Sequence, residues 1–124
     1  MPMPNLAYFE LPVDDLDRAK KFYQELLIWE FTKSENPDIP MEYWMIKTGP
    51  AEENTLNMGG MYKRQMNEPI VNYVMVDDID EKIAKVEKLG GKIAVPKREL
   101  ESVGQFVIIQ DTEGNVIALF KPMM

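Results

Sequence analysis

The sequence Val13-Asp14-Asp15-Leu16-Asp17 returns as Val76-Asp77-Asp78-Ile79-Asp80, 63 residues further along a chain of 124 residues. The same shift places Phe106 on Tyr43, so the correspondence extends beyond the repeated motif. A second match at one constant offset indicates an internal repeat rather than an isolated coincidence. Because two copies fill the chain, we predict one fold made of two similar halves.

The first half is predicted to form a βαβββ unit. Its helix follows Asp15, a good N-cap residue, and has apolar side chains at helical spacing; these are Leu16, Ala19, Tyr23, Leu26 and Leu27. Strand-forming residues precede and follow the helix. The expected elements are a strand at 5–13, a helix at 16–27, and strands at 29–32, 43–46 and 56–61.

The second half repeats this order after a polar linker at 62–69. Asp78 with Glu81 is typical of a helix start, and Gly90-Gly91 is typical of a helix end. The paired aspartates at 14–15 and 77–78 are therefore interpreted as caps rather than as acid–base pairs. The repeat places Leu26 on Leu89, which predicts that both helices bury the same face. The expected elements are a strand at 71–76, a helix at 79–89, and strands at 92–95, 105–110 and 116–120.

Composition narrows the class of protein. The chain is 45% hydrophobic, which suits one core at this length and predicts a single domain, 1–124. The 21 acidic and 14 basic residues give a net charge of −7, which opposes binding to nucleic acid. No apolar stretch is long enough to cross a membrane. With no cysteine or histidine, the chain lacks thiolate and imidazole chemistry, and we expect a soluble, cytoplasmic protein.

The ordered motifs resemble the vicinal oxygen chelate superfamily, which includes glyoxalase I, bleomycin-resistance proteins and extradiol dioxygenases. Within it, the chain is most similar to small proteins related to lactoylglutathione lyase. The residues that carry this resemblance are 9–19 with Phe22-Tyr23, Gly59-Gly60-Met61, 76–79, Leu89-Gly90-Gly91 and 111–115. The resemblance implies an α+β fold of two tandem βαβββ modules, at about 4–61 and 70–122. It also implies an incomplete, cupped mixed β-barrel with the helices outside, and a homodimer.

The resemblance further implies a divalent metal bound by His and Glu or Gln side chains from the first and last strands of each module. The first-strand positions fall on Tyr8 and Val71. The last-strand position falls on Ala118 in the second module and within Met58–Gly60 in the first, where the register stays open. None is a usual ligand, so we predict that the inherited metal site is absent and that no cofactor is needed. An oxygen-ligated divalent cation at Glu10 is the alternative.

A ligand-binding surface is predicted from strand alternation. Phe9, Leu11, Val74 and Val76 are expected to face the helices, which leaves the opposite face for a ligand. The candidate ligand-binding residues are Tyr8, Glu10, Met58, Val71, Tyr73, Met75, Ala118 and Phe120. Ordinary core packing is the competing interpretation, and we favour it for Val71, Met75 and Phe120.

Two functions remain open from the sequence. One is a binding protein of the bleomycin-resistance kind, which holds a small molecule and catalyses nothing. The other is an isomerase or lyase that uses no metal or an oxygen-ligated metal, with Glu10 as base and Tyr8 or Tyr73 as hydrogen-bond donor. The missing metal ligands favour the binding protein and make conventional glyoxalase I activity a poor expectation.

Overall fold

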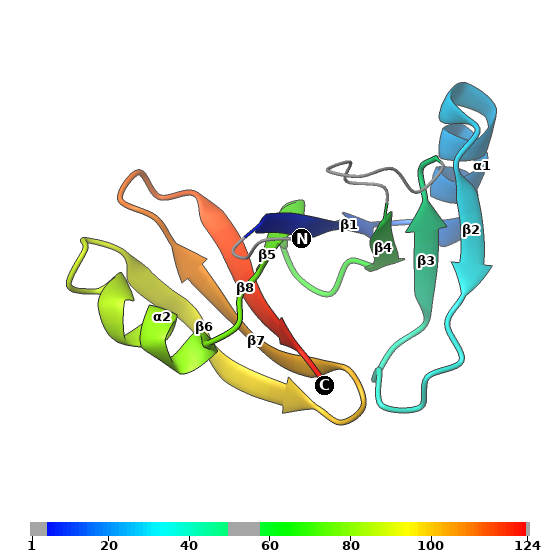
Figure 1. The fold of residues 1–124 in the computed structure, drawn as a ribbon. Coiled ribbons are helices and arrows are strands. Elements are labelled where there is room, and N and C mark those ends of the chain that lie inside the picture. Colours follow the sequence, from blue (N-terminus) through cyan, green and yellow to red (C-terminus); the bar gives the residue numbers. More distant parts are fainter. Residues whose placement is uncertain (1–4, 50–57, 124) are drawn as a thin grey trace. The chain divides into compact units, whose positions relative to one another are not determined.

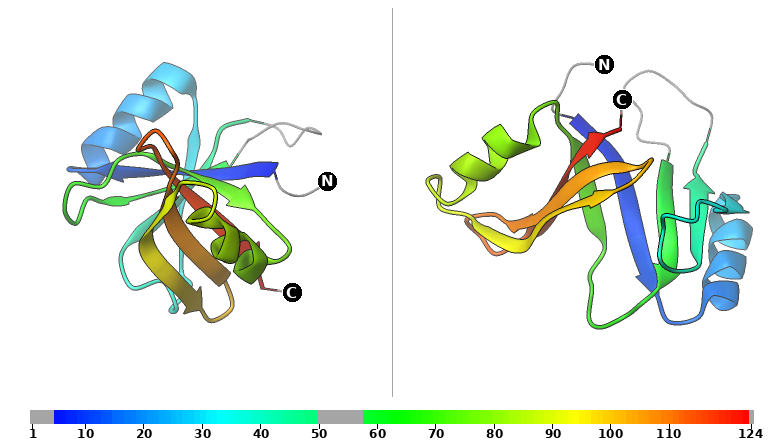
Figure 2. Two further views of the ribbon diagram at one scale, coloured as in Figure 1. Left: turned by 90° about the vertical axis from the view of Figure 1, so that its left-hand side faces the viewer. Right: turned by 90° about the horizontal axis from the view of Figure 1, so that it is seen from below.

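The computed structural model describes residues 5–49 and 58–123, and the chain divides into two compact units. The N-terminal unit spans Tyr8–Ile70 and includes most of the first strand, whereas the described residues before Tyr8 group with the C-terminal unit, which begins at Val71. Each unit contains one helix, which lies against that unit's own strands (Figures 1 and 2). In the part of the chain that the structure describes, neither helix has the length and apolar character needed to cross a bilayer.

The N-terminal unit has the predicted βαβββ order. Its elements are β1 (Asn5–Val13), α1 (Leu16–Leu27), β2 (Glu30–Lys33), β3 (Tyr43–Lys47) and β4 (Met58–Lys63). The strands lie in the order β2-β3-β4-β1. β3 is antiparallel to both β2 and β4, whereas β1 is parallel to β4. The first and last strands of the unit are therefore neighbours.

The C-terminal unit has the same order of elements and the same pairing. Its elements are β5 (Val71–Met75), α2 (Ile79–Val86), β6 (Lys92–Leu100), β7 (Gly104–Gln110) and β8 (Val116–Pro122). The strands lie in the order β5-β8-β7-β6, with β5 parallel to β8. The prediction of an α+β fold built from two βαβββ modules is confirmed.

Both helices begin at the predicted aspartates. A side-chain oxygen of Asp15 accepts a hydrogen bond from the Arg18 N–H at 3.0 Å, and Asp78 does the same for Glu81 at 3.0 Å. Each aspartate has extended backbone angles, as an N-cap residue should. The interpretation of Asp15 and Asp78 as capping residues is confirmed.

Each unit has its own hydrophobic core between the helix and one face of the strands. In the N-terminal unit, Leu11, Ile46 and Met61 are buried. They pack against the inner face of α1, which presents Leu16, Ala19 and Tyr23. In the C-terminal unit the core cluster consists of the buried Val76, Ile79 and Val107, with Val74 and Ile83 packed against them. The predicted helix-facing side of both leading strands is confirmed.

The prediction that Leu26 and Leu89 are buried is wrong, because they are 62% and 73% exposed. In the N-terminal unit, Trp29 packs at the edge of the core and its ring stacks on Tyr23 with centroids 5.1 Å apart. Tyr23 is therefore the last residue of the inner face of α1. In the C-terminal unit, α2 ends at Val86, three residues before Leu89. The Gly91 N–H donates a hydrogen bond to the Val86 carbonyl at this helix end.

Two strand boundaries also differ from the predictions. β6 continues to Leu100 rather than ending at Val95, because an edge strand tolerates Pro96 at a register shift. β4 runs through Tyr62 and Lys63, which the sequence assigned to the linker. The first two residues of the predicted strand at 56–61 lie outside the described residues.

Leu11→Ala and Leu26→Ala provide a matched test of this core. Leu11 is 6% exposed, so its truncation should lower the free energy of unfolding by about 2–5 kcal/mol. The exposed Leu26 should change it by less than about 0.5 kcal/mol. Urea denaturation followed by circular dichroism measures both, and equal losses would contradict the arrangement described.

Candidate functional site

A group of polar and aromatic side chains lies on the face of the N-terminal unit opposite α1. Tyr8 and Glu10 are two residues apart on β1, so they share a face, while Phe9 and Leu11 point to the helix. The strand register places Glu10 beside Gly60 of β4. We call the side chains of Tyr8, Glu10, Tyr43 and Tyr62 the tyrosine cluster.

Hydrogen bonds join three members of the cluster. The Tyr43 hydroxyl donates to Oε2 of Glu10 at 2.7 Å. The hydroxyl oxygens of Tyr8 and Tyr43 are 2.5 Å apart. Tyr43 is only 7% exposed, and Tyr8 and Glu10 are half-buried. A carboxylate is thus held on a strand by a buried phenol, which a second phenol contacts in turn.

Tyr62 extends the cluster along β4. Its ring lies nearly parallel to that of Tyr43, its partner across the strands, with centroids 6.4 Å apart. The Tyr62 hydroxyl donates to Oε2 of Glu68 at 3.1 Å. Glu68 also accepts hydrogen bonds from the backbone N–H groups of Gln65 and Met66. The turn after β4 therefore fixes the outer end of the cluster.

The three phenols of the cluster stay protonated at neutral pH. Burial is the main reason that the pKa values of Tyr8, Tyr43 and Tyr62 lie well above the usual value of about 10. The negative charge of Glu10 raises the pKa of all three hydroxyls further. These side chains can therefore donate and accept hydrogen bonds, but they do not supply a phenolate.

Gly60 makes room for the two phenol oxygens. A Cβ atom at position 60 would lie 1.8 Å from the Tyr43 hydroxyl oxygen and 2.4 Å from that of Tyr8. Such distances are far below van der Waals contact, so any side chain at this position would displace both hydroxyls. The absence of a side chain at position 60 is thus a requirement of the cluster.

The strand register also settles which residue of Met58–Gly60 corresponds to Ala118. Ala118 pairs with Tyr73, and Gly60 pairs with Glu10. Since Tyr73 and Glu10 occupy equivalent positions in the repeat, Gly60 is the N-terminal counterpart of Ala118.

The positions at which the family would hold a metal do not supply a suitable donor set. Tyr8 offers a hydroxyl that is already engaged with Tyr43, and Gly60 has no side chain. In the C-terminal unit, the equivalent Val71 and Ala118 are apolar and buried. Within residues 5–49 and 58–123, His, Cys, Asp and Glu side chains form no group of three that could hold a metal. At positions 8, 60, 71 and 118, the described residues thus present no carboxylate or imidazole.

The other predicted ligand-binding residues fall into two groups. Met58, at the start of β4, is exposed. In the C-terminal unit, Tyr73 pairs with Ala118 and Met75 with Phe120, so these four residues lie on one face of β5 and β8 together with Val71. Tyr73, Met75 and Phe120 are half-buried.

Sequence reasoning missed Tyr43 and Tyr62 as site residues. Tyr43 belongs to a strand that is apolar on both faces, so periodicity gave its side chain no direction. Tyr62 was assigned to the linker, although continued alternation from Gly60 would have placed it on the same face. For Tyr43, the signal was available only with the register of β3 against β4.

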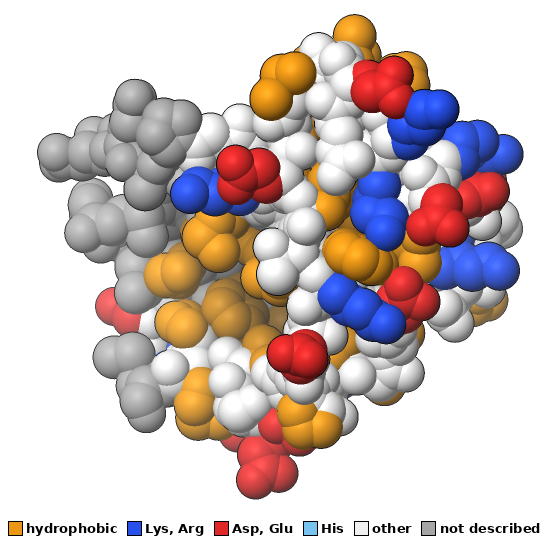
Figure 3. Space-filling view, turned by 90° about the vertical axis from the view of Figure 1, so that its right-hand side faces the viewer, with side chains coloured by type: hydrophobic (Ala, Val, Ile, Leu, Met, Phe, Trp, Pro, Cys, Tyr) orange, Lys and Arg blue, Asp and Glu red, His pale blue; other side chains and the backbone are white. Residues whose placement is uncertain are grey.

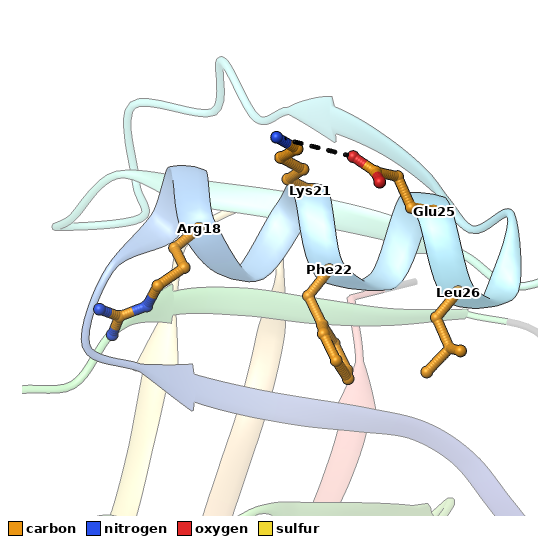
Figure 4. Close-up of a pocket in the computed structure, with 5 residues that line it drawn as sticks. All are labelled: Arg18, Lys21, Phe22, Glu25 and Leu26. Atoms are coloured by element: carbon orange, nitrogen blue, oxygen red, sulfur yellow. Dashed lines mark ion pairs between the residues drawn. The ribbon is translucent and has the colours of Figure 1, made fainter.

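A separate surface feature lies on the outer face of α1. The exposed Phe22 and Leu26 point the same way from the helix (Figure 4). With Arg18, Lys21 and Glu25 they line a shallow pocket of about 480 Å³. The face of the molecule in Figure 3 likewise shows hydrophobic side chains between charges of both signs. Because one helix supplies the whole lining, this pocket lacks the converging polar groups of a typical ligand site, and the tyrosine cluster is the better candidate.

Two βαβββ units in one chain, each with its first and last strands paired in parallel, define a glyoxalase-like fold. The model of the Glyoxalase/Bleomycin resistance protein/Dioxygenase superfamily matches residues 5–119. The chain belongs to this superfamily.

Three similar proteins illustrate this membership. A glyoxylase-like domain-containing protein of Didymella fabae is 32% identical over 118 residues, covering 92% of this chain and 91% of the relative. CFP32 of Mycobacterium bovis is 29% identical over 121 residues, and the chain spans 44% of its length. The crystal structure of methylmalonyl-CoA epimerase from Mycobacterium tuberculosis has the same fold, with a TM-score of 0.70 at 14% identity, covering 100% of this chain and 93% of that one.

Gly60→Ala should disturb the cluster, whereas Gly49→Ala should not. The new methyl group at position 60 overlaps two phenol oxygens, so we expect a loss of about 1–3 kcal/mol in the free energy of unfolding. Position 49 has open space around a Cβ, and its change should stay within about 0.5 kcal/mol. Urea denaturation measures both. A Gly60→Ala variant as stable as Gly49→Ala would contradict the close approach of the two hydroxyls.

Glu68 should make stability depend on pH in the acid range. Partial desolvation raises its pKa, but hydrogen bonds from backbone N–H groups and from Tyr62 outweigh this and lower the pKa to about 2. A lowered folded-state pKa adds stability above the ordinary value near 4.5, and this stability is lost as pH falls toward 2. The difference in unfolding free energy between the wild type and Glu68→Gln should therefore shrink over that range. A pH-independent difference would refute this assignment.

Proposed function

We propose that this protein binds a small molecule at the tyrosine cluster without the metal of its family. In this proposal it sequesters a ligand, as bleomycin-resistance proteins do, and it has no conventional glyoxalase I activity. The observation that carries the proposal is the hydrogen-bond network formed by Tyr8, Tyr43 and Glu10 beside Gly60.

The position of this hydrogen-bond network explains why a metal is not expected. In the family, side chains at positions 8 and 60 would be ligands. Here the hydroxyls of Tyr8 and Tyr43 lie where a side chain at position 60 would begin. An added ligand at this position would have to displace a buried phenol from its carboxylate partner. The space that the family's metal ligands would occupy is thus filled by the hydrogen-bonded side chains of Tyr8, Tyr43 and Glu10.

The burial of Glu10 supports a functional role. Removing a carboxylate from water is costly unless hydrogen bonds compensate it, and the Tyr43 hydroxyl supplies one such hydrogen bond to Glu10. The core of the unit lies on the opposite face of the strands and does not need this group. A carboxylate held in this way is typical of a binding or catalytic site.

The second candidate function is a metal-free isomerase or lyase with Glu10 as general base. The Tyr43–Glu10 hydrogen bond favours it because it fixes the carboxylate in one orientation, as catalysis requires. Glu10 would take a proton from a carbon beside a carbonyl group. The electron pair of the broken C–H bond would form the enolate. The proton on Glu10 would exchange with solvent, and Glu10 would then return a solvent-derived proton to the same carbon or to the neighbouring carbon. The epimerase with the same fold is named for a reaction that inverts such a centre.

Metal analysis and a ligand screen test the proposal together. After dialysis, the protein should contain no stoichiometric divalent ion; if one is found and Glu10→Gln releases it, the oxygen-ligated metal alternative replaces the proposal. In a thermal-shift screen of small molecules, a ligand at 100 times its Kd should add about 2.7 kcal/mol of stability. Glu10→Gln should abolish this gain, and Glu35→Gln, which changes an exposed glutamate of the same unit, should keep it.

Turnover separates the two functions. Each hit should be recovered unchanged after incubation in D₂O with the protein. Deuterium incorporation beside a carbonyl, lost in Glu10→Gln and kept in Glu35→Gln, would establish the isomerase instead. A screen with no hit that depends on Glu10 would overturn both functions for this site.

A further inference from the structure

We propose that the outer face of α1 binds the same face of a second copy of this chain, forming an antiparallel helix pair with twofold symmetry. This face presents two neighbouring rows of side chains, Arg18, Phe22 and Leu26 in one and Lys21 and Glu25 in the other. The members of each row are four residues apart, so they lie one above another along the helix. We call these five residues the α1 outer face.

The fold of the unit does not require the apolar residues of the α1 outer face. Phe22 is 57% exposed and Leu26 is 62% exposed, because the core packs against the opposite side of the helix. In the repeat, Phe22 corresponds to Lys85 of α2. Lys85 forms an ion pair with Glu81, the counterpart of Arg18, at 3.7 Å. Adjacent apolar side chains that remain exposed where the repeat has solvated charges indicate an interaction surface.

The shape of the α1 outer face suits another helix. Its five side chains line the shallow pocket of about 480 Å³, which lies along the surface of the helix (Figure 4). In the commonest class of helix pairs, a row of residues four apart packs between the equivalent rows of the other helix. Twofold symmetry makes such a contact self-complementary, because each copy supplies both a row and the space that receives one.

The charges of the α1 outer face select the antiparallel orientation. The basic Arg18 and Lys21 precede Phe22, whereas the acidic Glu25 follows it. If the twofold axis passes beside Phe22, Arg18 of one copy stands opposite position 26 of the other, about 1.5 Å along the helix from Glu25. Each copy thus brings its guanidinium to the carboxylate of the other. A parallel pair would instead place like charges together.

Both charged groups are accessible for this contact. Arg18 is exposed, and none of the ion pairs among the described residues includes it. Glu25 forms an exposed ion pair with Lys21 at 3.9 Å, and a carboxylate can accept from a second donor as well. Arginine and aromatic side chains are also enriched in protein interfaces. The exposed arginine and the exposed ring therefore have one explanation.

The dimer should be weak. α1 has 12 residues and is therefore about 18 Å long, so a pair of these faces buries less than the roughly 800 Å² per partner of a standard interface. Small interfaces are typical of transient association. The measurement therefore extends to protein concentrations of about 1 mM, at which a Kd in the millimolar range is still detected.

Sedimentation equilibrium measures the association. The wild type should show a concentration-dependent equilibrium between monomer and dimer. Phe22→Lys, which introduces the residue type that α2 has at this position, should raise the Kd by about tenfold or more. Leu89→Lys adds the same charge at an exposed leucine of the C-terminal unit and should leave the Kd unchanged. Thermal unfolding of each variant verifies that it is folded.

An exchange of charges tests the antiparallel orientation. In homodimers, Arg18→Glu places two carboxylates together and Glu25→Arg places two guanidinium groups together, so each variant alone should dimerise more weakly. An equimolar mixture of the two variants restores both contacts between opposite charges and should dimerise, as should the double variant. Both changes also suit the helix dipole, which favours acidic residues near the start of a helix and basic residues near its end.

The outcomes decide the proposal. A wild type that stays monomeric at about 1 mM overturns it; if Phe22→Lys then lowers the unfolding temperature, another part of the same chain covers this face. A dimer that Phe22→Lys leaves unchanged overturns it too, because association then uses another surface. Single charge variants whose mixture does not recover dimerisation overturn the antiparallel pairing. Glu10→Gln should dimerise like the wild type, so this test is independent of the proposed function.

Discussion

The candidate site depends on the parallel pairing of the first and last strands within the N-terminal unit. Two strands distant in sequence become neighbours, and their register sets Glu10 beside Gly60. β3 pairs with the other edge of β4, and this pairing places the Tyr43 hydroxyl next to Gly60. A shift of one residue in either pairing would move these side chains to the helix-facing side. The site is therefore a consequence of the backbone register.

This arrangement separates packing from chemistry. On one face of the N-terminal unit, apolar residues such as Leu11 and Met61 pack against α1 and supply the hydrophobic stabilisation of the unit. On the opposite face, Glu10 is held by Tyr43, although stability alone would favour an apolar residue there. The strands thus support a costly polar group because their other face provides the stability.

Much of the fold could be predicted from the sequence, because it depends on local signals. Capping aspartates and helical spacing located α1 and α2, and alternation gave the helix-facing sides of β1 and β5. The exposure of Leu26 could not be predicted, because helical spacing does not show that Trp29 packs against Tyr23. Tyr43 could not be placed, because its partners come from long-range strand pairing. Tyr62 could have been placed by continuing the alternation from Gly60, but the predicted strand ended at Met61.

The two units show why the repeat predicted the scaffold better than the site. From Tyr8 to Met45 the offset is 63 residues, but Gly60 corresponds to Ala118, which is 58 residues away, because the connections between the last two strands differ in length. With this register, the Tyr43–Tyr62 pair corresponds to Phe106 and Phe120, which also pair across their strands. Both units thus keep an aromatic pair.

The hydroxyls are present in only one of the two pairs, and the neighbouring residue differs accordingly. In the N-terminal unit, the Tyr43 hydroxyl occupies the space beside position 60, so this position must be glycine. In the C-terminal unit, Phe106 has no hydroxyl, and the corresponding Ala118 fits and is buried. The tyrosine hydroxyls and the absence of a Cβ at position 60 therefore depend on each other sterically. Strand pairing depends on backbone hydrogen bonds, so it tolerates this change of side chains. The same backbone thus supports an apolar face in one unit and a hydrogen-bonded carboxylate in the other.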